Sequence, residues 1–373
     1  MSVESNRPRW GSPPWTIDFH AASHALPDEV DFAVVGGGFT GLAAAAWLRR
    51  IAPEKSVAVF EADEVGGGAS GHTGGMALAE TAVGDLPGLG DVLQGFSDIL
   101  RTLEVDCDLT LPGVWELTRK KTRPSSPISW NDSGNLRVGE EVPGGTIDPG
   151  KLVSGLGRAA EKAGALIFEH ARVENVSFDA PLRVSLGSKE VRAGHALFGT
   201  DAQSLELSGL AASTEPKFTL ALATAPLAVE QLAELGLASG KPFYTVDFPY
   251  LWGRLLPGGG VIFGSGLVHS NDWRELLALD IATGEPAELL ARLERRVHGL
   301  HPALRSVEIT RRWGGPILIG EDWGPVFRRH PSSPLALVLG GYSGHGVALS
   351  VYLGRWAAEA LLGQRELPDW DAA

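Results

Sequence analysis

The chain has 373 residues, including 48 Gly and 24 Pro, and carries 45 acidic against 32 basic residues. Glycine stands at nearly twice its usual ~7% share, yet no Gly-X-Y period supports a collagen-like chain, and 44% hydrophobic residues with 11 Trp argue against disorder. The net charge of −13 disfavours nucleic acid as a partner, and the length predicts two domains or one large one.

The first 27 residues form an irregular, polar arm containing Pro and Trp. It lacks the apolar stretch of a secretory signal, and no run in the chain approaches the ~20 apolar residues that span a membrane. We therefore expect a cytoplasmic protein, with its oligomeric state open. The one cysteine, Cys107, excludes an internal disulfide and a Cys-based metal cluster. We interpret it as inert packing, with a catalytic thiol as the alternative.

A βαβ unit follows the arm. The β-branched run 30–35 predicts a buried parallel strand, 41–52 an Ala-rich helix closed by Pro53, and 56–61 a second strand ending in an acid.

A glycine motif joins the first strand to the helix. Gly36, Gly38 and Gly41 satisfy G-x-G-x-x-G, and Glu61 follows about 20 residues later. Gly36 permits a tight turn, Gly38 a close approach to a pyrophosphate, and Gly41 close packing of helix and strand. The helix N-terminus offers N–H groups to phosphates. Glu61 would accept hydrogen bonds from ribose and repel a 2′-phosphate, so the pattern predicts FAD or NAD rather than NADP; a glycine-rich turn without ligand is the alternative.

The rest of the chain alternates between α/β and β-rich patterns. The basic run at Arg119, Lys120, Lys121 and Arg123 is expected to be a solvated loop. The expected elements are a glycine cluster at 66–75, a strand near 114–117, a helix over 150–163, strands at 166–173, 182–186, 190–193 and 196–198, a β-rich stretch 215–319 with one helix near 286–298, a strand at 335–339, glycines at 340–346 and a last helix over 347–362.

These elements predict an α/β protein, α+β overall, with a discontinuous nucleotide-binding domain. We expect that domain to comprise residues 28–85, 145–205 and 320–373. A β-rich second domain would comprise 86–144 and 206–319, after the arm at 1–27.

With the second glycine cluster, the chain resembles the D-amino-acid oxidase-like family of FAD-dependent oxidoreductases, which includes glycine, sarcosine and γ-glutamylputrescine oxidases. Gly68-Ala69-Ser70-Gly71 is similar to the family's flavin-lining stretch. Further matches follow in order: Asp148-Pro149 with the strand ending at Val173, the W-x-G and D-x-x-P stretch within 313–325, and the glycine turn 340–346.

The resemblance implies a Rossmann-like FAD-binding domain of glutathione-reductase type with an inserted antiparallel substrate domain. It implies oxidation of a C–N bond of an amine or amino-acid-like substrate by hydride transfer to flavin N5, with oxygen or another electron acceptor. A 2-hydroxy-acid dehydrogenase and a flavin-binding protein without turnover stay as alternatives. Gly315 stands where sarcosine-oxidase relatives carry a tethering Cys, so FAD is expected to be non-covalent.

Two departures bear on the substrate and the acceptor. Ile317 occupies the position where amino-acid oxidases of this group often carry a carboxylate-binding Arg, so a small α-amino acid is disfavoured unless Arg254 substitutes. No Lys stands on the strand 261–264, where some oxidases carry one, so oxidase and dehydrogenase both stay open.

The candidate catalytic residues are His72, Tyr250, Arg254, Tyr342 and His345. Tyr250, Trp252 and Arg254 alternate on one expected strand and would share a face, although such a stripe is also typical of core, and both histidines and Tyr342 could be structural. The expected FAD contacts are Gly36, Gly38, Phe39, Thr40, Gly41, Glu61, Ala62, Gly68, Ala69, Ser70, Gly71, Gly75, Met76, Val173, Gly199, Thr200, Gly341, Tyr342, Ser343, Gly344, His345, Gly346 and Val347. The final helix would direct its N-terminus at the flavin N1–C2=O edge.

Overall fold

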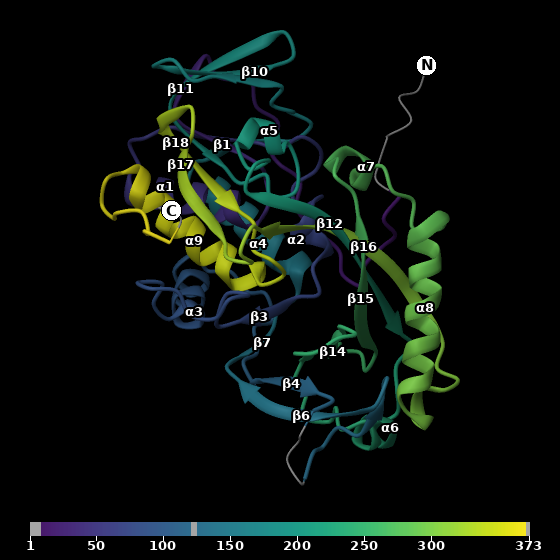
Figure 1. Ribbon diagram of the computed structural model, residues 1–373. Helices are drawn as coiled ribbons and strands as arrows, with labels where there is room; N and C mark the ends of the chain where they lie inside the picture. Colours follow the sequence, from purple (N-terminus) through teal and green to yellow (C-terminus); the bar gives the residue numbers. More distant parts are fainter. Residues whose placement is uncertain (1–8, 121–124, 371–373) are drawn as a thin grey trace. The chain divides into compact units, whose positions relative to one another are not determined.

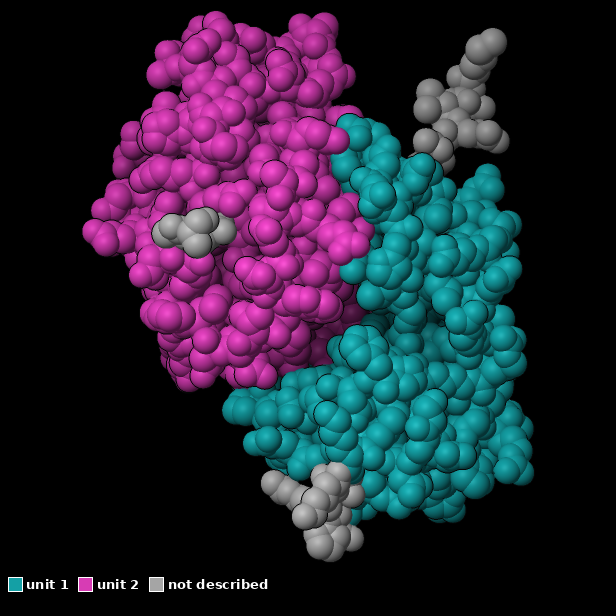
Figure 2. Space-filling model, in the orientation of Figure 1, with its two compact units in different colours: residues 1–14, 110–146, 217–316 teal, residues 15–109, 147–216, 317–373 magenta. Residues whose placement is uncertain are grey.

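A computed structural model describes residues 9–120 and 125–370. The chain divides into two compact units, coloured separately in Figure 2. We call residues 15–109, 147–216 and 317–373 the α/β unit, and residues 1–14, 110–146 and 217–316 the β unit.

The α/β unit is built on a mainly parallel sheet with the strand order β17-β18-β11-β1-β2-β8. Figure 1 labels β17, β18, β11 and β1 of this sheet. The antiparallel strands β10 and β9 extend from β11, and β17 is antiparallel to β18. The strands of this sheet are β1 (Glu29–Val35), β2 (Val57–Phe60), β8 (Leu166–Phe168), β9 (Asn175–Ser177), β10 (Leu182–Leu186), β11 (Lys189–Phe198), β17 (Val326–His330) and β18 (Ser333–Gly340), and β3 (Met76–Leu78) lies outside it. The helices are α1 (Phe39–Ile51), α2 (Ala69–His72), α3 (Val92–Thr102), α4 (Pro149–Lys162), α5 (Leu205–Ser208) and α9 (Gly346–Leu361).

Local sequence explains several boundaries in this unit. Strand β1 pairs in parallel with β2 and β11 and is buried along most of its length, as its continuous apolar run predicts. Helices α3 and α4 begin at Asp91 and Asp148, whose carboxylates each accept a main-chain N–H three residues on, at 2.9 Å.

The β unit is built on an eight-stranded sheet with the order β16-β12-β15-β14-β13-β4-β6-β5. The strands of this sheet are β4 (Val114–Thr118), β5 (Trp130–Asn131), β6 (Asn135–Val142), β12 (Thr214–Thr224), β13 (Phe243–Thr245), β14 (Trp252–Leu255), β15 (Val261–His269) and β16 (Ile309–Gly320), and β7 (Gly144–Thr146) lies outside it. The helices are α6 (Val229–Glu234), α7 (Trp273–Leu277), α8 (Gly284–Leu300) and the 3₁₀ turn η1 (Pro302–Leu304).

The two faces of this sheet differ in chemistry. On one face Leu117, Phe243 and Phe263 are fully buried and share a core with Leu293 and Val297 of α8. Because side chains alternate along a strand, the residues between them point to the opposite face. That second face carries the polar and aromatic side chains described below.

The structure corrects several expected boundaries. The strand expected over 166–173 ends at Phe168, because the chain turns at His170 with φ +54°. The two strands expected at 190–193 and 196–198 are one strand, β11. The strand expected to include Tyr250 begins only at Trp252, so Tyr250 lies in the preceding loop.

The division into units also differs from the expected domains. Residues 86–109 lie in the α/β unit, because α3 buries Phe96 and Ile99 in that unit's core. Residues 206–216 lie there too.

The expected N-terminal arm is not a separate body in its described part. Residues 9–14 belong to the β unit, where Trp10 packs edge-on against Phe218 at 5.5 Å. Residues 15–27 belong to the α/β unit, where Trp15 Nε1 donates to the Gly71 carbonyl at 2.7 Å. Among the described residues, no helix combines the length and the apolar character needed to cross a bilayer.

Candidate cofactor site and substrate face

The first glycine segment, residues 36–41, makes the tight turn that its sequence predicts. Gly36 has φ +109°, and a Cβ there would lie 2.6 Å from the Gly199 carbonyl oxygen. A Cβ on Gly41 would lie 2.0 Å from the Gly36 carbonyl oxygen and 3.0 Å from a Val34 methyl. Both positions therefore require glycine for close packing of β1, α1 and the end of β11.

The second glycine segment, residues 66–75, is hydrogen-bonded to the first. The Gly66 N–H donates to the Gly37 carbonyl at 3.0 Å, and the Phe39 N–H donates to Ser70 Oγ at 3.0 Å. A Cβ on Gly38 would lie 2.8 Å from the same Ser70 oxygen. Two stretches that are separate in sequence therefore form one backbone surface at the start of α1.

The third glycine segment, residues 340–346, is also tied to α1. The Tyr342 hydroxyl lies 2.7 Å from Thr40 Oγ1. Asp201, which follows β11, accepts the Gly341 N–H at 3.4 Å. Burial raises the pKa of the Asp201 carboxyl to about 6.

Glu61 supports the first segment from the end of β2. Its carboxylate accepts the Gly37 N–H at 2.7 Å and the Asp63 N–H at 3.0 Å. Burial raises the pKa of Glu61 despite these two bonds. Since a carboxylate offers about four acceptor positions, capacity remains for ribose hydroxyls.

The remaining expected contacts lie in the same unit. Ala62 follows β2, and Gly199 and Thr200 follow β11. Val173 lies in the loop after β8. Gly68, Ala69, Gly71, Gly75 and Met76 lie in or beside α2, and Ser343, Gly344, His345, Gly346 and Val347 lead into α9.

Two observations fit these residues to FAD. Within the described chain, the N-cap residues of α1 and α9, Gly38 and His345, make no side-chain hydrogen bond to their helices, whereas Asp91 and Asp148 cap α3 and α4. Ser70 accepts the Phe39 N–H, so the other first-turn N–H groups of α1 and those of α9 are the ones left for an anionic or polar ligand. The Thr200 hydroxyl is buried and has no hydrogen-bond partner among the described residues, although buried hydroxyls normally have one. A dinucleotide would supply acceptors for these N–H groups and a hydrogen-bond partner for the Thr200 hydroxyl.

The candidate catalytic residues of this unit are held by local main-chain contacts. His72 Nδ1 lies 2.9 Å from the Gly68 carbonyl, and His345 Nδ1 lies 3.3 Å from the Ser343 carbonyl. Burial lowers the pKa of both imidazoles, which favours neutral rings at pH 7. Tyr342 is buried, and its bond to Thr40 favours packing over catalysis.

Cys107 is buried in the core of the α/β unit. Burial and neighbouring aspartates raise the pKa of its thiol to about 12. A thiol that stays protonated is a poor nucleophile, which supports the packing interpretation.

The β unit carries the candidate Arg254, only 4% exposed, on the same face of β14 as Trp252. Sequence reasoning missed two neighbours on this face, Glu116 of β4 and Tyr244 of β13. The Tyr244 hydroxyl donates to Glu116 Oε1 at 2.6 Å. The alternation of apolar and polar residues over 114–118 weakly indicates that Glu116 points away from the core. Its partner Tyr244 could not be predicted, because the two residues meet only through the pairing of β4 with β13.

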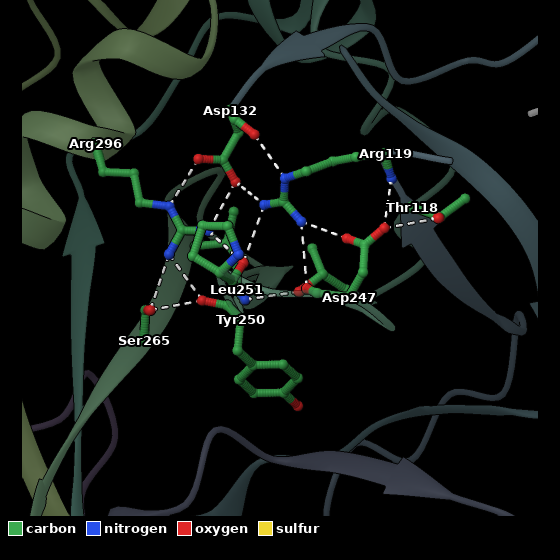
Figure 3. Close-up of polar contacts among 10 residues, drawn as sticks. Thr118, Arg119, Asp132, Asp247, Tyr250, Leu251, Ser265 and Arg296 are labelled. Carbon is green, nitrogen blue, oxygen red and sulfur yellow. Dashed lines mark hydrogen bonds and ion pairs between the residues drawn. The ribbon is translucent and has the colours of Figure 1, made fainter. Parts of the chain in front are cut away.

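A second group that the sequence did not reveal is an ion network around the loop between β13 and β14 (Figure 3). Asp132 lies between Arg119 and Arg296, accepting from Arg296 at 2.9 and 2.7 Å and from Arg119. Arg119 also pairs with Asp247. The expectation of a solvated basic run is therefore wrong for Arg119, whose side chain is 10% exposed, while Lys121 and Arg123 lie outside the described residues.

Known proteins agree with this architecture. The parallel sheet and the glycine segments at the starts of α1 and α9 are typical of a dinucleotide-binding domain. Residues 31–360 match the model of the FAD dependent oxidoreductase family, and the chain belongs to that family. It is therefore an FAD-dependent oxidoreductase, as its glycine segments predict.

Among curated proteins, the chain is 26% identical to the γ-glutamylputrescine oxidoreductase of Escherichia coli, covering 90% of this chain and 84% of that protein. It is equally identical, with the same coverage, to the probable oxidoreductase OrdL of Rhizobium meliloti. Among solved structures, L-proline dehydrogenase from P. horikoshii superposes with a TM-score of 0.73 at 18% identity, covering 93% of this chain and 97% of that one. Glycine oxidase from Geobacillus kaustophilus gives 0.72 at 18% identity, covering 92% and 98%.

Proposed function

We propose that this protein oxidises a C–N bond of a small amine, giving an imine that hydrolyses. The observation that carries the proposal is the set of three glycine segments in the α/β unit, of which the second and the third are each hydrogen-bonded to the first, and which would supply a cradle for non-covalent FAD. The named relatives support the C–N bond as the target, since γ-glutamylputrescine, proline and glycine are all amines or amino acids.

The chain's own residues would bind and orient the cofactor. The start of α1 would face the pyrophosphate, Glu61 the ribose and Thr200 a polar group of the dinucleotide. The start of α9 would stabilise negative charge on the reduced ring. Bound FAD supplies the hydride acceptor for the oxidation.

The proposed substrate is a primary or secondary amine that does not depend on an α-carboxylate clamp. The side chain of Ile317 adjoins the third glycine segment, with its Cδ1 3.6 Å from where a Cβ of Gly344 would lie. An isoleucine cannot form the paired hydrogen bonds with which Arg binds a carboxylate. Arg254 of the β unit is the alternative carboxylate partner.

The test is anaerobic reduction of the FAD-loaded protein by a panel of primary and secondary amines, glycine, sarcosine and 2-hydroxy acids. We expect amines to bleach the visible flavin band, and glycine and sarcosine to do so poorly. Bleaching by hydroxy acids alone would favour a 2-hydroxy-acid dehydrogenase, and no bleaching at all would favour a flavin-binding protein without turnover. A Gly41→Ala protein, expected to lack FAD, is the matched blank.

Admission of oxygen after reduction identifies the acceptor. Rapid return of the flavin band indicates an oxidase, whereas a persistently reduced flavin indicates another acceptor. We propose that the enzyme works in the cytoplasm, which cell fractionation tests.

A further inference from the structure

Three side chains form a row across one face of the β unit's sheet. Tyr244 of β13 is paired with Glu116 of β4 on one side and with Trp252 of β14 on the other. Paired residues on neighbouring strands point to the same face, and neighbouring strands lie about 4.8 Å apart, so the row spans about 10 Å. All three side chains are half-buried, whereas the other face is packed into the core.

The acidic end of the row keeps capacity for a ligand. Glu116 accepts the Tyr244 hydroxyl at 2.6 Å through one of its oxygens. A carboxylate accepts further bonds through both oxygens. The tyrosine bond therefore orients the carboxylate without exhausting it.

The aromatic end of the row is fixed by a glycine on the next strand. Trp252 is paired with Gly264 of β15. A Cβ on Gly264 would lie 2.0 Å from a ring carbon of Trp252, so the indole fills the space that any other side chain would need. The ring is thereby held against the backbone of β15 at a defined position.

The ion network of Figure 3 ties together the strands that carry the row. Asp247 follows β13 and accepts the Thr118 hydroxyl and the Arg119 N–H from the end of β4, each at 2.8 Å. Arg296 donates to the Pro249 carbonyl at 2.8 Å and the Tyr250 carbonyl at 2.7 Å, just before β14. The network therefore fixes the hairpin at the end where β4, β13 and β14 meet.

The network leaves no net charge, since it contains two arginines and two aspartates. The Tyr250 ring points away from it (Figure 3). The charges facing a ligand at the β4 end of the row are therefore those of Glu116 and of Glu140, which pairs with Glu116 from β6. Arg254 lies on the same face two residues beyond Trp252, so a cation is favoured near β4 rather than beside Arg254.

We propose that Glu116, Tyr244 and Trp252 form the subsite that binds the cationic nitrogen of the substrate, with Arg119, Asp132, Asp247 and Arg296 as positioning residues. A carboxylate gives an ammonium ion a charge-assisted hydrogen bond, and an indole face attracts it through its quadrupole. The substrate class is thus an amine that binds in its protonated form and gives its extra proton to the Glu116 carboxylate before its C–N bond is oxidised. This deepens the proposed function and rests on it.

The test compares N-methylbutylamine with its neutral isostere, butyl methyl ether. Calorimetric titration into FAD-loaded enzyme that has first been photoreduced under anaerobic conditions prevents turnover during binding. The native protein should bind the amine at least about tenfold more tightly than the ether. Equal binding of the two probes would overturn the proposal without any variant.

Glu116→Gln should reduce the preference for the amine to less than about threefold. Glu116→Asp should retain part of it, since the charge is kept. The matched control is Glu288→Gln, the same charge change at an exposed position of α8, on the helix that packs against the other face of the sheet; it should leave the preference unchanged. A Glu116→Gln protein with full preference and full FAD content would refute the subsite.

The positioning role has a separate readout. Asp247→Asn should raise KM for the amine by several-fold more than it lowers kcat, and it should leave FAD content unchanged. A fall in kcat as large as the rise in KM would refute the positioning role. Bleaching of oxidised flavin is recorded separately. Amine-selective binding without bleaching would support the subsite and refute the amine-oxidising function. Bleaching by amines without amine-selective binding would support the function and refute the subsite.

Discussion

Replacement of Asp132 by alanine should destabilise the β unit strongly. The Asp132 side chain is 4% exposed and lies between Arg119 and Arg296, which are 10% and 17% exposed. Its carboxylate accepts two hydrogen bonds from Arg296 and one from Arg119. Removing the Asp132 carboxylate leaves the largely buried guanidinium groups of Arg119 and Arg296 without the anion that lies between them, so the two positive charges repel each other.

Removing one partner of a buried ion pair costs about 3–5 kcal/mol. Arg119 keeps its bond to Asp247, so we expect a loss of about 3 kcal/mol for Asp132→Ala, near the lower end. Asp132→Asn keeps the size and one acceptor oxygen and should lose about 2 kcal/mol.

The assay is urea unfolding, with Glu294→Ala as the control. Glu294 pairs with Arg312 on the same unit, where the two side chains are 30% and 40% exposed, so its loss should cost less than about 1 kcal/mol. The Leu251 N–H donates to Thr245 Oγ1 at 2.9 Å across the loop between β13 and β14. Hydrogen exchange of this amide should accelerate in Asp132→Ala. If Asp132→Ala matched the control in stability and exchange, the network would have no stabilising role.

Four further outcomes follow from the α/β unit. Gly41→Ala should abolish FAD binding, because its Cβ would lie 2.0 Å from a carbonyl oxygen; Gly258→Ala, which meets nothing within 4 Å, should retain the flavin spectrum. Thr200→Val should weaken FAD binding about tenfold if its buried hydroxyl bonds the dinucleotide, and unchanged affinity in a fluorescence titration would refute that bond. The pKa of Asp201 rises from 3.8 to about 6 on folding, so its contribution to stability is lost as pH rises through about 6; Asp201→Asn should therefore stabilise FAD-depleted protein more at pH 8 than at pH 5 in urea unfolding, and equal effects would contradict this. Native Cys107 should react with iodoacetamide only on unfolding, which mass spectrometry checks, since burial keeps its thiol protonated.

The α/β unit was predictable because its signals are local. The strand, the glycines and the helix of residues 29–51 adjoin in sequence, so each glycine's role could be worked out from its neighbours. The predicted end of the strand at residue 173 was wrong because His170 adopts a left-handed backbone conformation that ends the strand at Phe168. Nothing in the apolar pattern of the sequence marks that turn.

The substrate face was only partly predictable because its contacts are long-range. Glu116 and Tyr244 are 128 positions apart and meet only through the parallel pairing of β4 and β13. Arg119 fits a solvated basic run by sequence, yet Asp247, also 128 positions away, buries it. Composition cannot reveal such partners.

The order in which the chain is made gives the packing of α9 on α1 a further consequence. A Cβ on Gly354 of α9 would lie 2.7 Å from the Thr40 carbonyl of α1, so the two helices meet at backbone distance. Because α9 lies far C-terminal to α1 in the chain, α1 is synthesised long before the helix that covers it. The small apolar surface of α1, from Ala43 to Ala46, therefore lacks this partner until α9 has been made, and the α1–α9 contact can form only after that point in synthesis.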